Sequence, residues 1–358
     1  PGAQVHELSS LSSRDPEALD PKPTPPLSKC QRLYSRLPKL RAPNPPDRPT
    51  FTQWLRRCWL DVLTQLLCAL IALIIYLTAT PLLPRYFPLY PGIQTSPWGL
   101  KYGQPYLPEY INTTVSAAVS FFVPFAVMSV MSGWWGDCFW DGNAACIGLG
   151  YALATATLVQ SLIKWIIGGL RPHFLALCNP PIPPAYGGRG PSGIFYTADV
   201  CRGNPSALRE AQMSFPSGHA CAAFAGFGFV ALYFNAKFGV FGHKPRPRAS
   251  TSEALDEARG GQGVEVEVKE VQEEKRVRVS HWRLVLFVAP IVVAVLLAAS
   301  KVRDAWHHPV DVVFGSLVGM LFALMAYRMV YRSVWDQRTN HLAREVYGGS
   351  EKGEVREE

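Results

Sequence analysis

The chain has 358 residues, 48% of them hydrophobic, and its 35 lysines and arginines exceed its 27 aspartates and glutamates to give a formal net charge of +8. The apolar residues are concentrated in long runs, which excludes an ordinary soluble domain and indicates an integral membrane protein. Because the basic residues gather outside these runs, their charge is weak evidence for nucleic-acid binding, which would require a compact basic fold, and we expect no nucleic-acid partner.

Residues 1–54 are rich in proline and basic residues and contain the stretches "PKPTPPLSKC" and "RAPNPPDRPT". This composition is typical of a disordered tail. No cleavable signal peptide is recognisable in it.

Six apolar runs follow, each of about 18 residues or more, the length that an α-helix needs to cross a bilayer. Most contain small residues that let helices pack closely. The sequence therefore predicts an all-α fold: a six-helix membrane domain over residues 55–335 with a charged, flexible insert at 239–281, followed by a polar C-terminal tail at 336–358. The predicted spans are Leu60–Leu83, Thr113–Trp135, Asn143–Leu170, Gly218–Phe238, Trp282–Ser300 and Pro309–Arg332.

The distribution of lysine and arginine predicts the orientation of these helices. The N-terminal tail, the insert and the C-terminal tail are rich in basic residues, and six spans place all three on one face. Since basic segments stay on the cytosolic side, we expect both termini in the cytosol. The opposite face, lumenal or extracellular, then receives the loops 84–112 and 171–217 and the junction 301–308. The organelle and the oligomeric state stay open.

Eight cysteines are present, without the spacing of a metal site. Cys178 and Cys201 share the loop 171–217, which faces an oxidising space if the predicted orientation is right. The two residues are a candidate disulfide, and free thiols are the alternative.

The first polar cluster is "KWIIGGLRP", in which Lys164 and Arg171 are seven residues apart. On a helix this is about two turns, so we expect both side chains on one face, about 10 Å apart. Pro172 is expected to end the helix. Two cations that snorkel to the membrane interface are the alternative. Lys164, however, lies inside an apolar run, where a cation usually has a functional partner.

The second cluster is "SFPSGHA", which opens the fourth predicted helix. Ser217 is a favourable N-cap, and the backbone N–H groups from Gly218 onward are free donors at the helix N-terminus. Such a terminus favours an anion, phosphate in particular. His219 lies in the same first turn. An ordinary helix cap with an incidental histidine is the alternative.

The third cluster is "SKVRDAWHHPVDV", between the fifth and sixth predicted helices. His307 and Asp311 are four residues apart, so the carboxylate can orient the imidazole and make it a better nucleophile or base. Pro309 suits a first helical position. Surface histidines or a pair of metal ligands are the alternatives, but the neighbourhood offers no further ligands, and we expect no metal site and no cofactor.

Taken together, the clusters indicate phosphoryl transfer, in which cations and helix amides hold a phosphate, one histidine attacks it and another protonates the leaving group. Such chemistry depends mainly on positioning and charge stabilisation. No acidic cluster suggests a magnesium site, so the basic residues would supply that stabilisation.

The patterns K-x6-RP from Lys164, PSGH from Pro216 and S-x6-H-x3-D from Ser300 resemble the three-part signature of the type-2 phosphatidic acid phosphatase family. The stretches "RPHFLALC" and "HHPVDV" look like its eukaryotic lipid branch, the lipid phosphate and diacylglycerol pyrophosphate phosphatases. The resemblance covers about residues 55–335.

The resemblance implies a six-helix bundle of the acid phosphatase and vanadium haloperoxidase type that hydrolyses lipid phosphates without a metal. Expected substrates are phosphatidic acid, diacylglycerol pyrophosphate, lysophosphatidic acid or a sphingoid-base phosphate. It further implies that His307 is the nucleophile and forms a phosphohistidine, that Asp311 orients it, that His219 is the general acid, and that Lys164, Arg171, Ser217 and Gly218 hold the phosphate.

One position departs from the family pattern, because Lys301 stands where the third motif normally has arginine. Lysine offers a point charge in place of a two-pronged contact. Lys301 is therefore a tentative phosphate contact, and Arg303 would face the other side of a helix. A relative that binds or moves lipid without catalysis is one alternative function. A vanadate-dependent haloperoxidase is another, although six membrane spans argue against it.

Overall fold

The computed structural model describes residues 49–135, 139–182, 188–241, 281–337 and 339–344, all within one compact unit, Arg41–Glu358. The predicted N-terminal tail up to residue 48, most of the predicted insert (242–280) and the end of the C-terminal tail (345–358) lie outside the described residues.

Among the described residues, six helices are long and apolar enough to cross a membrane, which confirms the six-span prediction and defines a multi-pass membrane protein. The first helix begins at Phe51 rather than Leu60, because Thr50 and Gln53 cap it reciprocally. The fifth continues to Arg303 rather than ending at Ser300. The six helices are α2 (Phe51–Thr78), α4 (Thr113–Trp135), α5 (Phe139–Ile167), α8 (Gly218–Phe238), α10 (His281–Arg303) and α11 (Pro309–Val330).

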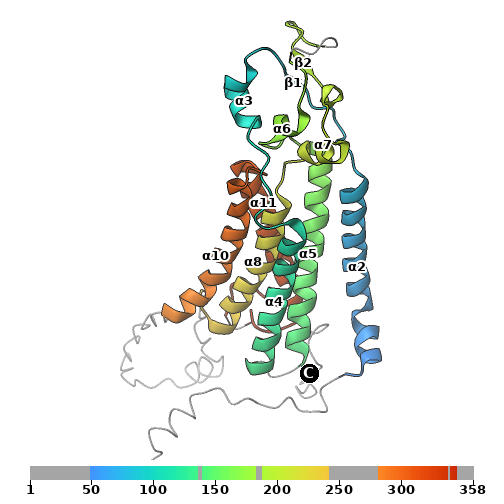
Figure 1. Ribbon diagram of the computed structural model, residues 1–358. Helices are drawn as coiled ribbons and strands as arrows, with labels where there is room; N and C mark the ends of the chain where they lie inside the picture. Colours follow the sequence, from blue (N-terminus) through green and yellow to red (C-terminus); the bar gives the residue numbers. More distant parts are fainter. Residues whose placement is uncertain (1–48, 136–138, 183–187, 242–280, 338, 345–358) are drawn as a thin grey trace, which may run out of the picture. The chain divides into compact units, whose positions relative to one another are not determined.

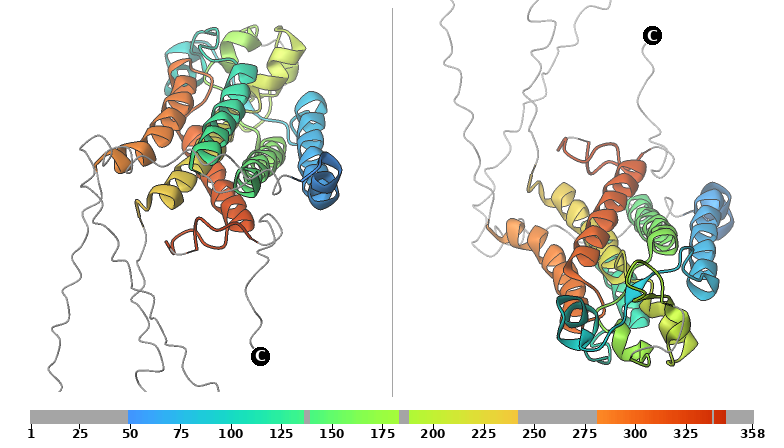
Figure 2. Two further views of the ribbon diagram at one scale, coloured as in Figure 1. Left: turned by 90° about the horizontal axis from the view of Figure 1, so that it is seen from below. Right: turned by 90° about the horizontal axis from the view of Figure 1, so that it is seen from above.

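Helix α8 is the centre of the bundle and packs against α4, α5, α10 and α11, whereas α2 lies at the edge beside α5 (Figures 1 and 2). Accordingly, 83% of the residues in the apolar 18-residue stretch of α8 are buried inside the protein, against 11% in that of α2. Glycines allow the closest approach: a Cβ on Gly315 of α11 would collide with the backbone oxygen of Ser217, the N-cap of α8, and a Cβ on Gly319 with that of Cys221 in α8. Small residues at a four-residue spacing are typical of membrane helix contacts.

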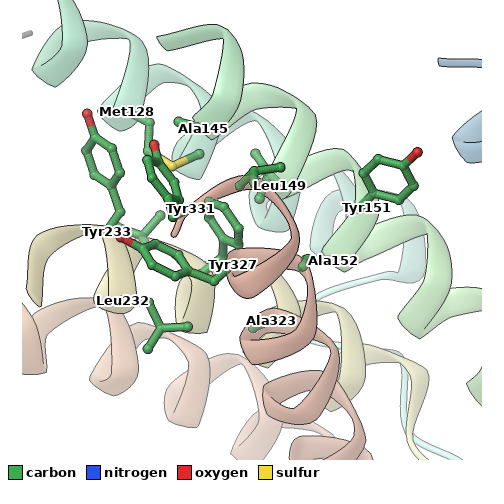
Figure 3. Packing of buried hydrophobic residues seen from close by; sticks show 14 of the residues in the cluster. Met128, Ala145, Leu149, Tyr151, Ala152, Leu232, Tyr233, Ala323, Tyr327 and Tyr331 are labelled. Carbon is green, nitrogen blue, oxygen red and sulfur yellow. The ribbon is translucent and has the colours of Figure 1, made fainter. Parts of the chain in front are cut away.

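Three tyrosines fill the core at the end of the bundle where α5 begins (Figure 3). Tyr327 and Tyr331 stack with ring centroids 4.6 Å apart, and Tyr233 donates a hydrogen bond of 3.2 Å to Asp141. Asp141 also pairs with Lys237 at 2.8 Å. The buried hydroxyl and carboxylate groups therefore have partners, as a low-dielectric core requires.

At the other end of the bundle, residues 84–112, 171–182 and 188–217 form a small folded layer, here called the cap (Figure 1). They were predicted as loops, but they contain short elements around a separate apolar core that includes Phe87, Phe174 and Tyr196. A disulfide joins Cys178 and Cys201 within it. The elements are β1 (Phe87–Pro88), η2 (Ile93–Thr95), α3 (Pro97–Tyr102), α6 (Phe174–Cys178), β2 (Phe195–Tyr196, antiparallel to β1), η3 (Ala198–Val200) and α7 (Pro205–Ala211).

Candidate functional site

The turn after α5 carries Arg171 into the site. The helix ends at Ile167, and Gly168 and Gly169 then adopt φ values of 62° and 119°, which side chains rarely tolerate. Lys164 and Arg171 therefore do not share one helix face, and this prediction from spacing was wrong. After the turn, Arg171 N donates 2.8 Å to Ala211 O, so the chain pairs with the segment that precedes α8.

The Arg171 side chain is buried, with 4% exposed, at the base of the cap. Its Nη2 donates to Glu210 Oε1 at 3.0 Å, and the guanidinium lies 4.7 Å from the ring centroid of Trp306. The Nε and Nη1 atoms are buried and have no hydrogen-bond partner among the described residues. Since a buried unpaired donor is costly, these atoms are suited to an anion that enters the site.

The second sequence cluster forms the N-terminus of α8. Ser217 is fully buried and caps the helix, with its Oγ accepting from Ala220 N at 3.4 Å. Gly218 and His219 lie ahead of the first intrahelical bond, from Cys221 N to Ser217 O, so their N–H groups are terminal donors. The Ser217 N–H donates 3.0 Å to Asp311 O, which joins this terminus to that of α11.

His307 lies at the junction of α10 and α11 and is 3% exposed. Its Nδ1 is 3.6 Å from Asp311 Oδ2 and 3.5 Å from Ser214 Oγ. Asp311 is itself held, since Oδ2 accepts from Ser214 Oγ at 2.5 Å and from the His308 N–H at 3.1 Å. The carboxylate is thus fixed on one side of the imidazole, which leaves the Nε2 side for another ligand.

Burial lowers the pKa of His307, and the charges of Arg171 and Lys164 act in the same direction while Asp311 opposes them. The imidazole is therefore neutral near pH 7, the form that can act as a nucleophile. The neighbouring His308 differs, because its Nε2 is 3.2 Å from Leu170 O. That contact ties His308 to the turn after α5, so the geometry separates the two adjacent histidines.

Lys301 lies in α10 and is fully buried. Its Nζ donates to Glu109 Oε2 at 2.9 Å and to Ile111 O, so its charge is already paired with the cap. Arg303 is exposed and lies over the ring of Tyr110 at 4.8 Å. As the helical spacing predicted, Arg303 does not take the place of Lys301.

Lys164, in the last turn of α5, interacts electrostatically with Arg171, Glu210 and Asp311 and completes the cluster. The structure thus gathers all the predicted site residues at one end of the bundle. The sequence also missed four participants: Glu109, Glu210, Ser214 and Trp306. Ser214 and Trp306 lie within the quoted motifs, and Glu109 is the one acidic residue of the segment 84–112.

Within the described part of the chain, no group of three or more histidine, cysteine, aspartate or glutamate side chains is placed to hold a metal ion. What is present is a set of cations, a helix N-terminus and an oriented neutral imidazole. Positive groups and terminal amides around a buried imidazole suit a tetrahedral oxyanion.

A bundle of six apolar helices with a cluster of histidines and cations at one end defines a class of multi-pass membrane proteins. The chain belongs to the PAP2 superfamily, whose family model matches residues 145–335. The chain is similar to a PA-phosphatase related-family protein of Dictyostelium discoideum, with 30% identity over 67% of this chain and 62% of the relative.

Two further relatives have more specific names. Lipid phosphate phosphatase 1 of Arabidopsis thaliana is 29% identical over 56% of this chain and 49% of its own length. Diacylglycerol pyrophosphate phosphatase 1 of Saccharomyces cerevisiae is 26% identical over 64% of this chain and 67% of its own. The chain thus spans about half to two thirds of the length of these relatives. No solved structure matches the chain.

Proposed function

We propose that the chain is a lipid phosphate phosphatase that hydrolyses the phosphomonoester of phosphatidic acid or the terminal phosphate of diacylglycerol pyrophosphate. The observation that carries this proposal is the buried His307, held by Asp311 beside Lys164 and the unpartnered nitrogens of Arg171. The names of the relatives support the substrate class, since they include lipid phosphate and diacylglycerol pyrophosphate phosphatases.

In the proposed mechanism the phosphate binds to Lys164, Arg171 and the terminal amides of α8. His307 Nε2 attacks phosphorus, the P–O bond to the lipid breaks, and His219 gives its proton to the departing oxygen. Water then attacks the phosphohistidine, His219 takes a proton from that water, and inorganic phosphate leaves. Asp311 holds the imidazole throughout and stabilises the charge that it gains.

The test is release of inorganic phosphate from short-chain phosphatidic acid by the purified protein in detergent micelles. We expect steady release that persists in EDTA, because basic residues supply the charge stabilisation. Loss of activity on chelation, restored by magnesium, would point to a different mechanism. A protein that binds the lipid without releasing phosphate would establish the non-catalytic alternative, which the neutralised charge of Lys301 favours. The haloperoxidase alternative predicts vanadate-dependent halide oxidation instead.

We also propose that both termini are cytosolic and that the site faces the lumen or the exterior. The basic tails support this orientation, as does the disulfide in the cap, since disulfides persist in oxidising compartments. In sealed vesicles of known orientation, protease should cleave the tail between Arg36 and Arg41 only from the cytosolic side. Cleavage from the opposite side would show that the proposed orientation is wrong and that the site faces the cytosol.

A further inference from the structure

The cap segment 107–111 is hydrogen-bonded to the junction between α10 and α11. Trp306 Nε1 donates 3.0 Å to Leu107 O, and Tyr110 N donates 2.7 Å to Asp304 Oδ2. Contacts at both ends of a five-residue segment fix the position of the residue between them, Glu109. This carboxylate is therefore a built feature of the site and not a surface group that happens to lie nearby.

The Glu109 carboxylate lies between two positively chargeable groups. Its Oε2 atom is 2.9 Å from Lys301 Nζ and 3.7 Å from His219 Nε2, and its side chain is 12% exposed. His219 Nε2 is buried and has no hydrogen-bond partner among the described residues. One carboxylate oxygen thus faces both the lysine that departs from the family pattern and the histidine predicted to be the general acid.

His219 otherwise faces positive charge. Its imidazole is buried, and the charges of Lys301 from α10, Lys164 from α5 and Arg171 beyond the end of α5 act on it electrostatically. A proton on His219 would be repelled by these cations. The proposed mechanism nevertheless needs that proton at the moment when the lipid oxygen departs, and a carboxylate beside Nε2 would stabilise it.

We propose that Glu109 is a positioning residue that orients the His219 ring toward the leaving oxygen and stabilises its protonated form during transfer, with Lys301 fixing the carboxylate in place. This inference rests on the proposed phosphatase function. If Glu109 acts through the proton on His219, its loss should affect two lipid substrates differently, whereas loss of a residue that only supports the fold should affect both alike. An alcohol leaving from phosphatidic acid needs a proton, whereas phosphatidate leaving from diacylglycerol pyrophosphate is a stabilised anion and needs little help.

The experiment compares Glu109→Gln with the wild type on short-chain phosphatidic acid and on diacylglycerol pyrophosphate of the same chain length. We expect the rate on phosphatidic acid to fall at least about tenfold more than the rate on the pyrophosphate, since general acid catalysis is typically worth about 10²–10⁴-fold and the variant removes part of it. Because both rates come from one preparation, their ratio does not depend on the fraction of folded protein. Equal losses on the two lipids would overturn the inference.

Two further variants sharpen the comparison. His219→Ala should change the ratio in the same direction as Glu109→Gln. Glu210→Gln removes the carboxylate that pairs with Arg171 and should lower both rates alike; the same change in ratio as for Glu109→Gln would contradict a role specific to His219.

Glu109→Asp keeps the negative charge but places it farther from His219, because the side chain is one methylene shorter. It should change the ratio of the rates on phosphatidic acid and diacylglycerol pyrophosphate less than Glu109→Gln does. If Glu109→Gln cannot be recovered, the aspartate variant alone decides, because an unchanged ratio overturns the inference. A wild-type protein inactive on both lipids would instead refute the proposed function, and the inference with it.

Discussion

Replacement of His307 by alanine is expected to abolish phosphate release from phosphatidic acid, leaving less than about 1% of the wild-type rate, because without the nucleophile no covalent intermediate forms. Folding should be little affected in detergent, since the removed ring is replaced by space that a phosphate or water can fill. The measurement is phosphate release at saturating lipid, with thermal unfolding followed on the same samples.

His308→Ala is the matched control, because the two histidines are adjacent and differ in what they contact. His308 is bound to Leu170 O and lies edge-on to Tyr102, with ring centroids 5.3 Å apart. We expect this variant to keep a substantial part of the activity. If it were the inactive one and His307→Ala retained turnover, the assignment of the nucleophile would be wrong.

The second large effect is expected at Lys301. Lys301→Met should lower the free energy of unfolding by about 2–4 kcal/mol, because it leaves the largely buried Glu109 carboxylate without its lysine partner. Activity on phosphatidic acid should also fall, since a carboxylate freed from Lys301 would meet the incoming phosphate with like charge. Thermal unfolding in detergent and phosphate release measure the two effects.

Arg303→Ala is the control on the same helix. Arg303 is exposed and lies over the ring of Tyr110. The free energy of unfolding of this variant should therefore remain within about 0.5 kcal/mol of the wild-type value, as is usual for surface substitutions. The double variant Lys301→Met/Glu109→Gln should recover much of the stability lost in Lys301→Met. Failure to recover any of it would show that the pair itself is not what stabilises this corner.

The sequence predicted the six spans because their apolar length is a local property that needs no knowledge of the fold. It could also group the three motifs, since their positions at helix ends follow from the alternation of spans across the bilayer. The conformation after α5 was predicted wrongly, because the periodic pattern continues through Gly168 and Gly169 although both adopt positive φ. A glycine can adopt either sign of φ, so its presence in the sequence does not reveal which one the structure uses.

Glu109 could not have been assigned to the site from the sequence. It lies in the cap, far along the chain from His219 and Lys301, and it reaches them because the segment 107–111 is bound by side chains of the α10–α11 junction. No local pattern encodes such a contact. The sequence does show that a lysine stands at position 301 where the family pattern has arginine. Only the structure shows that this lysine is already paired with a carboxylate, that of Glu109.

Turnover is expected to pass through a phosphate bound covalently to His307, and rapid acid-free quenching with substrate labelled in the phosphate tests this most directly. The wild type should carry label that is stable in base and lost in acid, on the peptide that contains His307, and His307→Ala should carry none. Turnover without a labelled intermediate at any quenching time, or label that maps to His308, His219 or another side chain, would contradict the account.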